Sequence, residues 1–187
     1  MSRLIAEPFV SLDGVVEMSH NWTTPYFDQE LAALMKASSA EKSAMLMGRN
    51  TYQEMVRYWP EISSEGDPVA GYMNRTPKYV VSDTLESLTW ENSTLISGNV
   101  LQQLELLKDR PGSDISIPGS AALVRSLLHA GLLDELRPLV FPVVLGSGAR
   151  LFDGWDEPLA MTLTSSASLR SGVLALAYQP AGTTTEQ

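Results

Sequence analysis

Apolar positions along the chain follow two spacings, one typical of strands and one typical of amphipathic helices. Short apolar or β-branched runs predict strands at 3–10, 44–47, 78–82, 93–97, 115–117 and 136–145. Apolar residues three and four positions apart predict helices at 25–38, 51–58, 100–108 and 120–131. The segments 160–168 and 173–179 alternate around Arg170-Ser171-Gly172, which predicts an antiparallel hairpin.

The order of these elements predicts an α/β fold whose sheet is mostly parallel and ends in an antiparallel hairpin. A chain of 187 residues lies in the range of one domain, which we place at 1–180. Residues 181–187 are predicted to be a disordered tail. The run 136–145 is the most apolar of the chain, and its Pro138 and Pro142 imply bulges or an edge strand.

The segment 17–24 is irregular and carries large side chains, including Trp22. Such a loop either covers a site or simply packs Trp22 on the core. Pro25 suits the first turn of the following helix, with Thr24 as its N-cap. Asp28 falls in that first turn, where the helix dipole alone accounts for an acidic residue.

Composition and charge exclude several classes of function. The chain has no cysteine and only His20 and His129, which argues against thiol catalysis, cysteine-bound zinc and a multi-histidine metal centre. A net charge of -9 with no basic run argues against nucleic-acid binding. The chain has no apolar run of membrane-spanning length and no signal-peptide pattern, so we expect a cytoplasmic protein with no membrane partner.

The sequence Met-Gly-Arg-Asn-Thr-Tyr, residues 47–52, ends one predicted strand and begins a helix. Free backbone N–H groups and the positive end of the helix dipole at such a junction can bind a phosphate. Arg49 adds a guanidinium that can grip a phosphate with two hydrogen bonds, and Thr51 adds a hydroxyl. The alternative is a surface arginine beside a turn glycine.

Two more strand ends carry small or hydroxylated residues. Ser82 closes the strand 78–82, and Pro118-Gly119-Ser120 joins the strand 115–117 to the next helix. Small residues at such a turn let a pyrophosphate approach the backbone closely. An ordinary strand-to-helix turn explains the same residues without a ligand.

Four stretches together resemble a known family. They are Ser-Leu-Asp-Gly from Ser11, the 47–52 motif, Ile-Pro-Gly-Ser-Ala-Ala-Leu from Ile117, and the long run from Gly131 to Phe152. The chain resembles the dihydrofolate reductase-like family, a three-layer α/β fold. It is most similar to the branch that contains the C-terminal reductase domain of the riboflavin-biosynthesis deaminase-reductase.

This resemblance implies an NADPH-dependent reductase. Its cofactor would lie across the carboxyl ends of the strands, contacting Gly48, Arg49, Thr51 and Ser82, with Gly119, Ser120 and Ala121 at the pyrophosphate. Family members usually have two glycines at this last turn, whereas this chain has Gly119 followed by Ser120. The resemblance also implies a small-molecule substrate, and relatives often pair near the run 136–145, so a homodimer is expected.

The substrate is less well defined by the resemblance. True dihydrofolate reductases place a carboxylate where this chain has Phe27, and Asp28 is displaced by one residue, or about 100° around a helix. Folate is therefore disfavoured. Asp28 and Asp13 are the catalytic candidates, Trp22 and Phe27 the substrate-binding ones, and no metal is expected. The expected reaction is hydride transfer to a pyrimidine-like, pterin-like or ribosylamino-type substrate, and the alternative is a non-catalytic nucleotide-binding protein.

Overall fold

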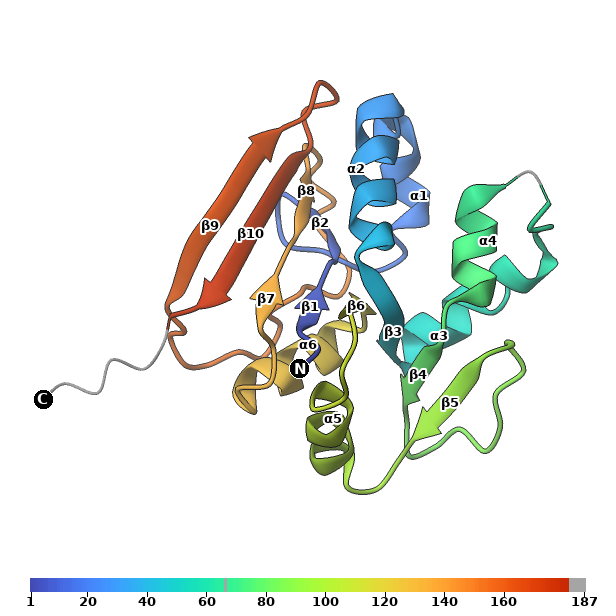
Figure 1. The fold of residues 1–187 in the computed structure, drawn as a ribbon. Coiled ribbons are helices and arrows are strands. Elements are labelled where there is room, and N and C mark those ends of the chain that lie inside the picture. Colours follow the sequence, from blue (N-terminus) through green and yellow to red (C-terminus); the bar gives the residue numbers. More distant parts are fainter. Residues whose placement is uncertain (66, 182–187) are drawn as a thin grey trace, which may run out of the picture.

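A ten-stranded mixed sheet forms the centre of the protein (Figure 1). The computed structural model describes residues 1–65 and 67–181. The strands are β1 Leu4–Ala6, β2 Phe9–Ser11, β3 Lys42–Gly48, β4 Lys78–Val81, β5 Ser93–Ile96, β6 Asp114–Gly119, β7 Glu135–Leu136, β8 Leu139–Phe141, β9 Met161–Ser168 and β10 Leu174–Pro180. The helices are α1 His20–Thr23, α2 Gln29–Ala40, α3 Arg49–Met55, α4 Pro68–Arg75, α5 Val100–Lys108 and α6 Ala121–His129, with 3-10 turns at Thr24–Tyr26 and Trp59–Glu61.

The sheet has the order β2-β8-β10-β7-β1-β6-β3-β4-β5, and β9 pairs with β10. From β7 to β5 along this order all neighbours are parallel, whereas β10 runs antiparallel to β7, β8 and β9. The fold is therefore the predicted dihydrofolate reductase-like α/β fold, with a mostly parallel sheet and an antiparallel hairpin at its end.

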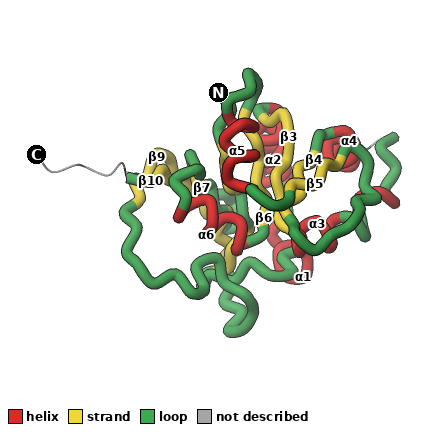
Figure 2. Tube along the Cα trace, turned by 90° about the horizontal axis from the view of Figure 1, so that it is seen from below, coloured by secondary structure: helices red, strands yellow, loops and turns green. Residues whose placement is uncertain are grey.

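Helices cover both faces of the sheet and bury three apolar clusters. On one face, leucines of α5 and α6 pack against β1, β3 and β6, and these two helices lie in front when the molecule is seen from below (Figure 2). On the other face, α3 and α4 enclose Met45, Met47 and Val80. Leu31 of α2 packs there against Phe141 and Val173. The parallel strands are thus shielded from water on both sides, as their continuous apolar runs require.

The long predicted strands are interrupted. The strand 3–10 is two strands, β1 and β2, separated at Pro8, and 136–145 is β7 and β8, separated at Pro138. Both prolines lack the N–H that a continuous ladder needs. The prolines of the run 136–145 are expected to mark bulges or an edge strand. Pro138 instead interrupts the run, and β8 is not at an edge, because it lies between β2 and β10.

Two helices differ from the sequence prediction. The helix predicted from Pro25 begins at Gln29 with Asp28 as its N-cap, because Thr24, Pro25 and Tyr26 form a separate 3-10 turn and Phe27 is extended. The helix α4 lies outside the segments predicted to be helical. It begins at Pro68 and is capped by Asp67, whose side chain accepts the N–H groups of Val69 and Ala70. Of the predicted tail 181–187, only Ala181 is among the described residues, and it donates a backbone hydrogen bond to Ala160.

None of the helices in residues 1–65 and 67–181 is both long and apolar enough to span a membrane.

Candidate functional site

The carboxyl ends of β3, β4 and β6 meet at one edge of the sheet, because these strands are parallel neighbours. Met47 of β3 is in register with Gly119 of β6, and Gly48 is in register with Val81 of β4. The turns that lead into α3, into α6 and away from β4 therefore open on the same edge. This is the position where ligands bind in open α/β sheets.

Two glycines at this edge let the turns touch each other. A Cβ atom on Gly48 would collide with Ser120 Oγ, and a Cβ atom on Gly119 would lie 2.7 Å from Thr51 Oγ1. Gly119 also has a φ of 159°, and its peptide bond to Ser120 is cis. The structure thus brings together Gly48, Thr51, Gly119 and Ser120, which belong to two motifs about seventy residues apart in sequence.

Arg49 begins α3 directly after Gly48 and is exposed. Its Nη1 donates to Thr84 Oγ1 at 2.9 Å, and its Nε donates to Asn50 Oδ1 at 3.4 Å. The other N–H donors of this guanidinium make no hydrogen bond within the described part of the chain. Arg49 is therefore held over the β4 turn with donors left for a phosphate.

Ser82 lies at the same edge but uses its hydroxyl to build the turn after β4. It is buried, and its Oγ accepts the backbone N–H groups of Thr84 at 3.2 Å and Leu85 at 3.1 Å. Ser82 therefore positions Thr84, the residue that contacts Arg49. Sequence reasoning did not select Thr84, although the polar turn that contains it was visible directly after the strand.

Ser120 caps the N-terminus of α6, and Ala121 is the first residue of that helix. The Ser120 side chain accepts the N–H of Leu123 at 3.4 Å. The first N–H groups of a helix have no partner within it, and the dipole favours an anion there. Both predicted contact residues therefore lie where a pyrophosphate could receive backbone donors.

A pocket of about 420 Å³ lies beside the carboxyl ends of β2 and β8. It is lined by residues of the segment after β2, of α1 and of the segment after β8, namely Val15, Glu17, Met18, Trp22, Leu145, Ser147 and Gly148. The Trp22 Nε1 donates to the backbone carbonyl of Glu17 at 3.1 Å, and its ring meets Phe141 edge-on at 5.5 Å. Trp22 therefore both packs on the core and lines the pocket, so the two interpretations of this loop are compatible.

Phe27 lies outside this pocket lining. Its side chain is 47% exposed, and its ring contacts Phe9 at a centroid distance of 6.1 Å. An exposed aromatic ring in that position can stack on a ligand but offers no charge or hydrogen bond. Phe27 stays a candidate for substrate contact through apolar surface alone.

Asp13 holds one wall of the pocket in place. Its carboxylate accepts the Ser11 hydroxyl at 2.7 Å and the backbone N–H groups of Leu145 at 3.1 Å and Gly146 at 2.8 Å. The hydrogen bond from Ser11, followed by those from Leu145 and Gly146, lowers the pKa of Asp13 to about 2. A carboxylate this acidic is ionised at neutral pH, so Asp13 has no proton to donate there.

Asp28 is the N-cap of α2. Its Oδ1 accepts the backbone N–H of Leu31 at 2.8 Å, and the Leu31 side chain is fully buried against β8 and the hairpin. This geometry matches the structural explanation of an acidic residue at a helix start. The carboxylate sets the position of α2, which forms part of the cover over this face of the sheet.

Glu7 is a partly buried acidic residue directly after β1 that sequence reasoning did not select. Its carboxylate accepts the Ser116 hydroxyl at 2.7 Å and lies 3.2 Å from Lys42 Nζ. Burial, and then the negative charge of Glu7, raise the pKa of the Tyr72 hydroxyl. The signal in the sequence was an acidic residue directly after an apolar strand. The partners of Glu7 indicate that its carboxylate joins β1, β3 and β6.

Metal-ligand geometry is not found in the described residues. Within 1–65 and 67–181, no three histidine, cysteine, aspartate or glutamate side chains converge on a common point.

Comparison with known proteins places the chain among reductase-like sequences. The family model described as RibD C-terminal domain matches residues 2–175. An uncharacterized protein of Bacillus subtilis strain 168, YyaP, is 27% identical over 181 residues, which is 94% of each chain.

Solved structures share the fold. A putative riboflavin biosynthesis protein from Shewanella sp. PV-4 has a TM-score of 0.74 at 19% identity and covers 96% of this chain and 99% of its own. A deaminase/5-amino-6-(5-phosphoribosylamino)uracil reductase from Thermotoga maritima has a TM-score of 0.68 at 13% identity, covering 96% of this chain and 57% of its own. Dihydrofolate reductase from Enterococcus faecalis, solved with NADP(H), has a TM-score of 0.62 at 12% identity and covers 95% of this chain and 96% of its own.

Proposed function

The chain belongs to the RibD C-terminal domain family, and we propose from this membership that it is an NADPH-dependent reductase. Its substrate would be a small heterocycle of the pyrimidine-like, pterin-like or ribosylamino type. The observation that carries the proposal is the convergence of Gly48, Arg49 and Gly119 at one sheet edge. Family membership and fold give a reductase framework, and this convergence supports the choice of cofactor.

The residues at the edge fit a dinucleotide with a 2′-phosphate. Arg49 has free guanidinium donors beside Thr84, which suits the 2′-phosphate. Gly48 and Gly119 let the two turns pack together without a Cβ atom that would collide with Ser120 or Thr51, and this packing brings the N-termini of α3 and α6 to one edge, which suits binding of a pyrophosphate. Bound NADPH would supply the hydride, and the protein would supply binding and orientation.

The rest of the site would position the substrate and limit access of water. Trp22 of α1 and the segment before it form one wall of the 420 Å³ pocket, and Leu145, Ser147 and Gly148 form the other. Neither Asp13 nor Asp28 is arranged as a proton donor, because the Asp13 carboxylate accepts backbone N–H groups of the segment after β8 and Asp28 caps a helix. We therefore assign the proton that accompanies hydride transfer to solvent.

Two departures from the family pattern favour a second function. Phe27 occupies the position of the expected carboxylate, and Ser120 occupies that of the second glycine. A protein with these changes could retain nucleotide binding on the same fold without turning over a substrate. This rival is a non-catalytic nucleotide-binding protein.

Stopped-flow oxidation of bound NADPH separates the two functions. The protein is saturated with NADPH and mixed with a panel of pterins, pyrimidines and quinones, and loss of the reduced nicotinamide absorbance is followed. A reductase oxidises the cofactor with at least one member of the panel at a rate that saturates with substrate. Saturable cofactor binding without oxidation by any of them would support the non-catalytic rival.

The Arg49→Ala protein is the matched control for this experiment. Its oxidation rate should fall at limiting NADPH and return toward the wild-type rate at saturating NADPH, because Arg49 is assigned to cofactor binding and not to the hydride step.

A further inference from the structure

The pocket beside Trp22 has an unbalanced charge. Its lining includes four apolar side chains, Val15, Met18, Trp22 and Leu145, and one ionisable side chain, Glu17. None of the lining residues in the described chain is lysine, arginine or histidine. The pocket therefore offers apolar side chains that include the ring of Trp22, a few polar groups and one carboxylate, a lining that suits a planar ring.

Glu17 connects the two walls of this pocket. Its backbone carbonyl accepts Trp22 Nε1 at 3.1 Å, and its Oε2 accepts the backbone N–H of Ala149 at 3.1 Å. Glu17 makes no ion pair within residues 1–65 and 67–181. Its negative charge is therefore fixed at the pocket without a neutralising cation.

The basic side chains nearest along these loops have other partners. Arg150 donates from Nε to the Asp13 carbonyl at 2.9 Å, and its Nη2 lies 3.7 Å from Asp13 Oδ2. Arg125 on α6 donates from Nη1 to the carbonyls of Arg150 and Leu151 at 3.3 and 2.9 Å. Arg150 also lines a separate, mostly apolar pocket. Neither arginine is among the residues that line the pocket beside Trp22.

We infer that the substrate end of the site takes an uncharged or cationic ring and disfavours a phosphate ester, with Glu17 as the specificity-determining residue. The inference rests on the proposed function, since it names the substrate class of that site. This substrate class differs from that of the Thermotoga maritima reductase, whose name specifies a phosphoribosylamino substrate. A dianionic phosphate about 6 Å from the Glu17 carboxylate would bind about ten-fold more weakly through repulsion in bulk-water dielectric.

Two ligand pairs that differ only by a phosphate test this inference. Uridine with uridine 5′-phosphate, and riboflavin with its 5′-phosphate, are titrated against the full chain by equilibrium dialysis at low ionic strength. We expect at least one unphosphorylated ligand to bind about ten-fold more tightly than its phosphorylated partner. Equal or tighter binding of the phosphorylated ligand, or no binding by either pair, would overturn the inference.

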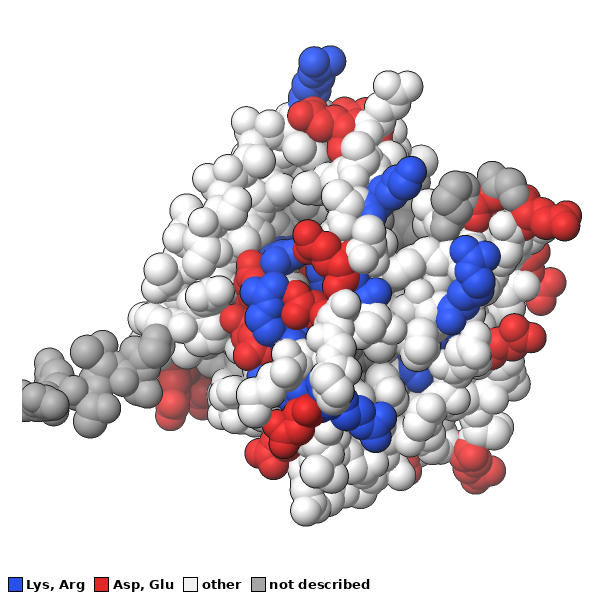
Figure 3. Space-filling model, in the orientation of Figure 1, with Lys and Arg blue, Asp and Glu red and all other residues white. Residues whose placement is uncertain are grey.

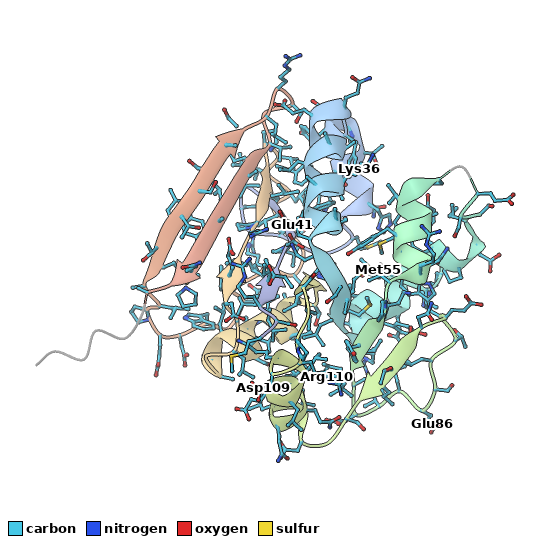
Figure 4. All side chains as sticks on the ribbon, in the orientation of Figure 1. Lys36, Glu41, Met55, Glu86, Asp109 and Arg110 are labelled. Atoms are coloured by element: carbon cyan, nitrogen blue, oxygen red, sulfur yellow. The ribbon has the colours of Figure 1, made fainter. Side chains whose placement is uncertain are left out.

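Glu17→Gln identifies the source of the preference. Glutamine keeps an oxygen for the N–H of Ala149 but removes the charge, so the ten-fold difference should shrink to about two-fold or less. Glu86→Gln removes the same charge from the segment between β4 and β5, at the lower right of Figure 4, and should leave the difference intact. A preference unchanged in Glu17→Gln, or lost equally in Glu86→Gln, would contradict a role for Glu17.

Failure of this inference is distinguishable from failure of the proposed function. NADPH binding at Arg49 is measured in a separate titration without any ring ligand. A protein that binds and oxidises NADPH but prefers phosphorylated rings would retain the reductase assignment and lose only the inferred substrate class.

Discussion

Gly48 and Ser120 contact each other across the ends of two parallel strands, so the turns after β3 and β6 pack directly against each other. Both residues come from motifs seen in the sequence. Gly48 belongs to a strand-to-helix junction whose free backbone N–H groups can bind a phosphate, and Ser120 belongs to a turn whose small residues permit close approach of a pyrophosphate. Their mutual contact was not visible there, since it depends on the β3–β6 register. The roles of Asp28 and Asp13 likewise depend on the exact partners of each carboxylate, which sequence spacing does not determine.

The substitution Gly48→Ala tests the contact directly. The added methyl group would meet Ser120 Oγ, so we expect a loss of about 1–3 kcal/mol in unfolding free energy together with weaker NADPH binding. The double variant Gly48→Ala, Ser120→Gly removes the collision at the cost of a few tenths of a kcal/mol for the cap. Urea unfolding of the single and double variants checks this, and a double variant no more stable than Gly48→Ala would argue against the contact.

The lowered pKa of Asp13 predicts that the stability of the fold decreases at acid pH. Its pKa in the folded protein is about 2, below the ordinary value of 3.8, so its stabilising contribution is fully present above about pH 4. The contribution is lost as the pH falls through about 2. Thermal melting between pH 2 and 5 should show a steeper fall for the wild type than for Asp13→Asn, and parallel curves would show that the hydrogen bonds to Asp13 do not stabilise the fold.

Helix and strand boundaries show where local sequence signals compete. The apolar spacing was sufficient to predict α2, α5 and α6, although α5 and α6 bury two and three leucines and α2 buries only Leu31. The start of α2 was wrong because Thr24-Pro25 satisfies the rules for a helix start but forms a 3-10 turn. The helix α4 was missed although Asp67-Pro68 is a cap followed by proline at the first helical position, since Gly71 and the polar residues before it suggested a loop.

Substitutions at Asp28, the N-cap of α2, distinguish a structural role of this residue from a catalytic one. We expect Asp28→Ala to lower the unfolding free energy by about 0.5–2 kcal/mol, because the N–H of Leu31 loses its acceptor. Asp28→Ser keeps a capping oxygen without the carboxylate and should retain both stability and the rate of NADPH oxidation at saturation. Gln29→Ala, at the exposed neighbouring position, is the control. A large loss of rate in Asp28→Ser with normal stability would restore Asp28 as a catalytic residue.

The distribution of charge over the whole molecule sets the hairpin apart. The net charge is -9, and lysine, arginine, aspartate and glutamate side chains intermix near the centre of the view in Figure 3, while the surface over β9 is white. The order of elements along the sequence was enough to predict the sheet and its antiparallel end. The exposure of the hairpin could not be predicted, because it depends on which strand lies at the edge of the sheet.

We propose that two copies of the chain associate through this hairpin. The strands β9 and β10 contain no charged residue, and the same face carries Leu163 and Leu174, which are 50% and 39% exposed. Two copies of an acidic chain repel each other least across a charge-free surface, and exposed uncharged edge strands favour pairing. Sedimentation of the wild type should show a dimer. Leu163→Asp should dissociate this dimer, whereas Ser165→Asp, on the opposite face of the hairpin, should leave it intact. A monomeric wild type would refute the proposal.

The central claim, an NADPH site built on Arg49, is tested most directly by titrating wild type and Arg49→Ala with both NADPH and NADH. Loss of a charge-assisted contact to the 2′-phosphate should cost about 1.5–3 kcal/mol, which is roughly 10- to 150-fold in Kd for NADPH. The Kd for NADH, which lacks that phosphate, should change little, and Arg57→Ala should leave both values near wild type. An NADPH preference that survives in Arg49→Ala, or an equal loss for both cofactors, would contradict the account.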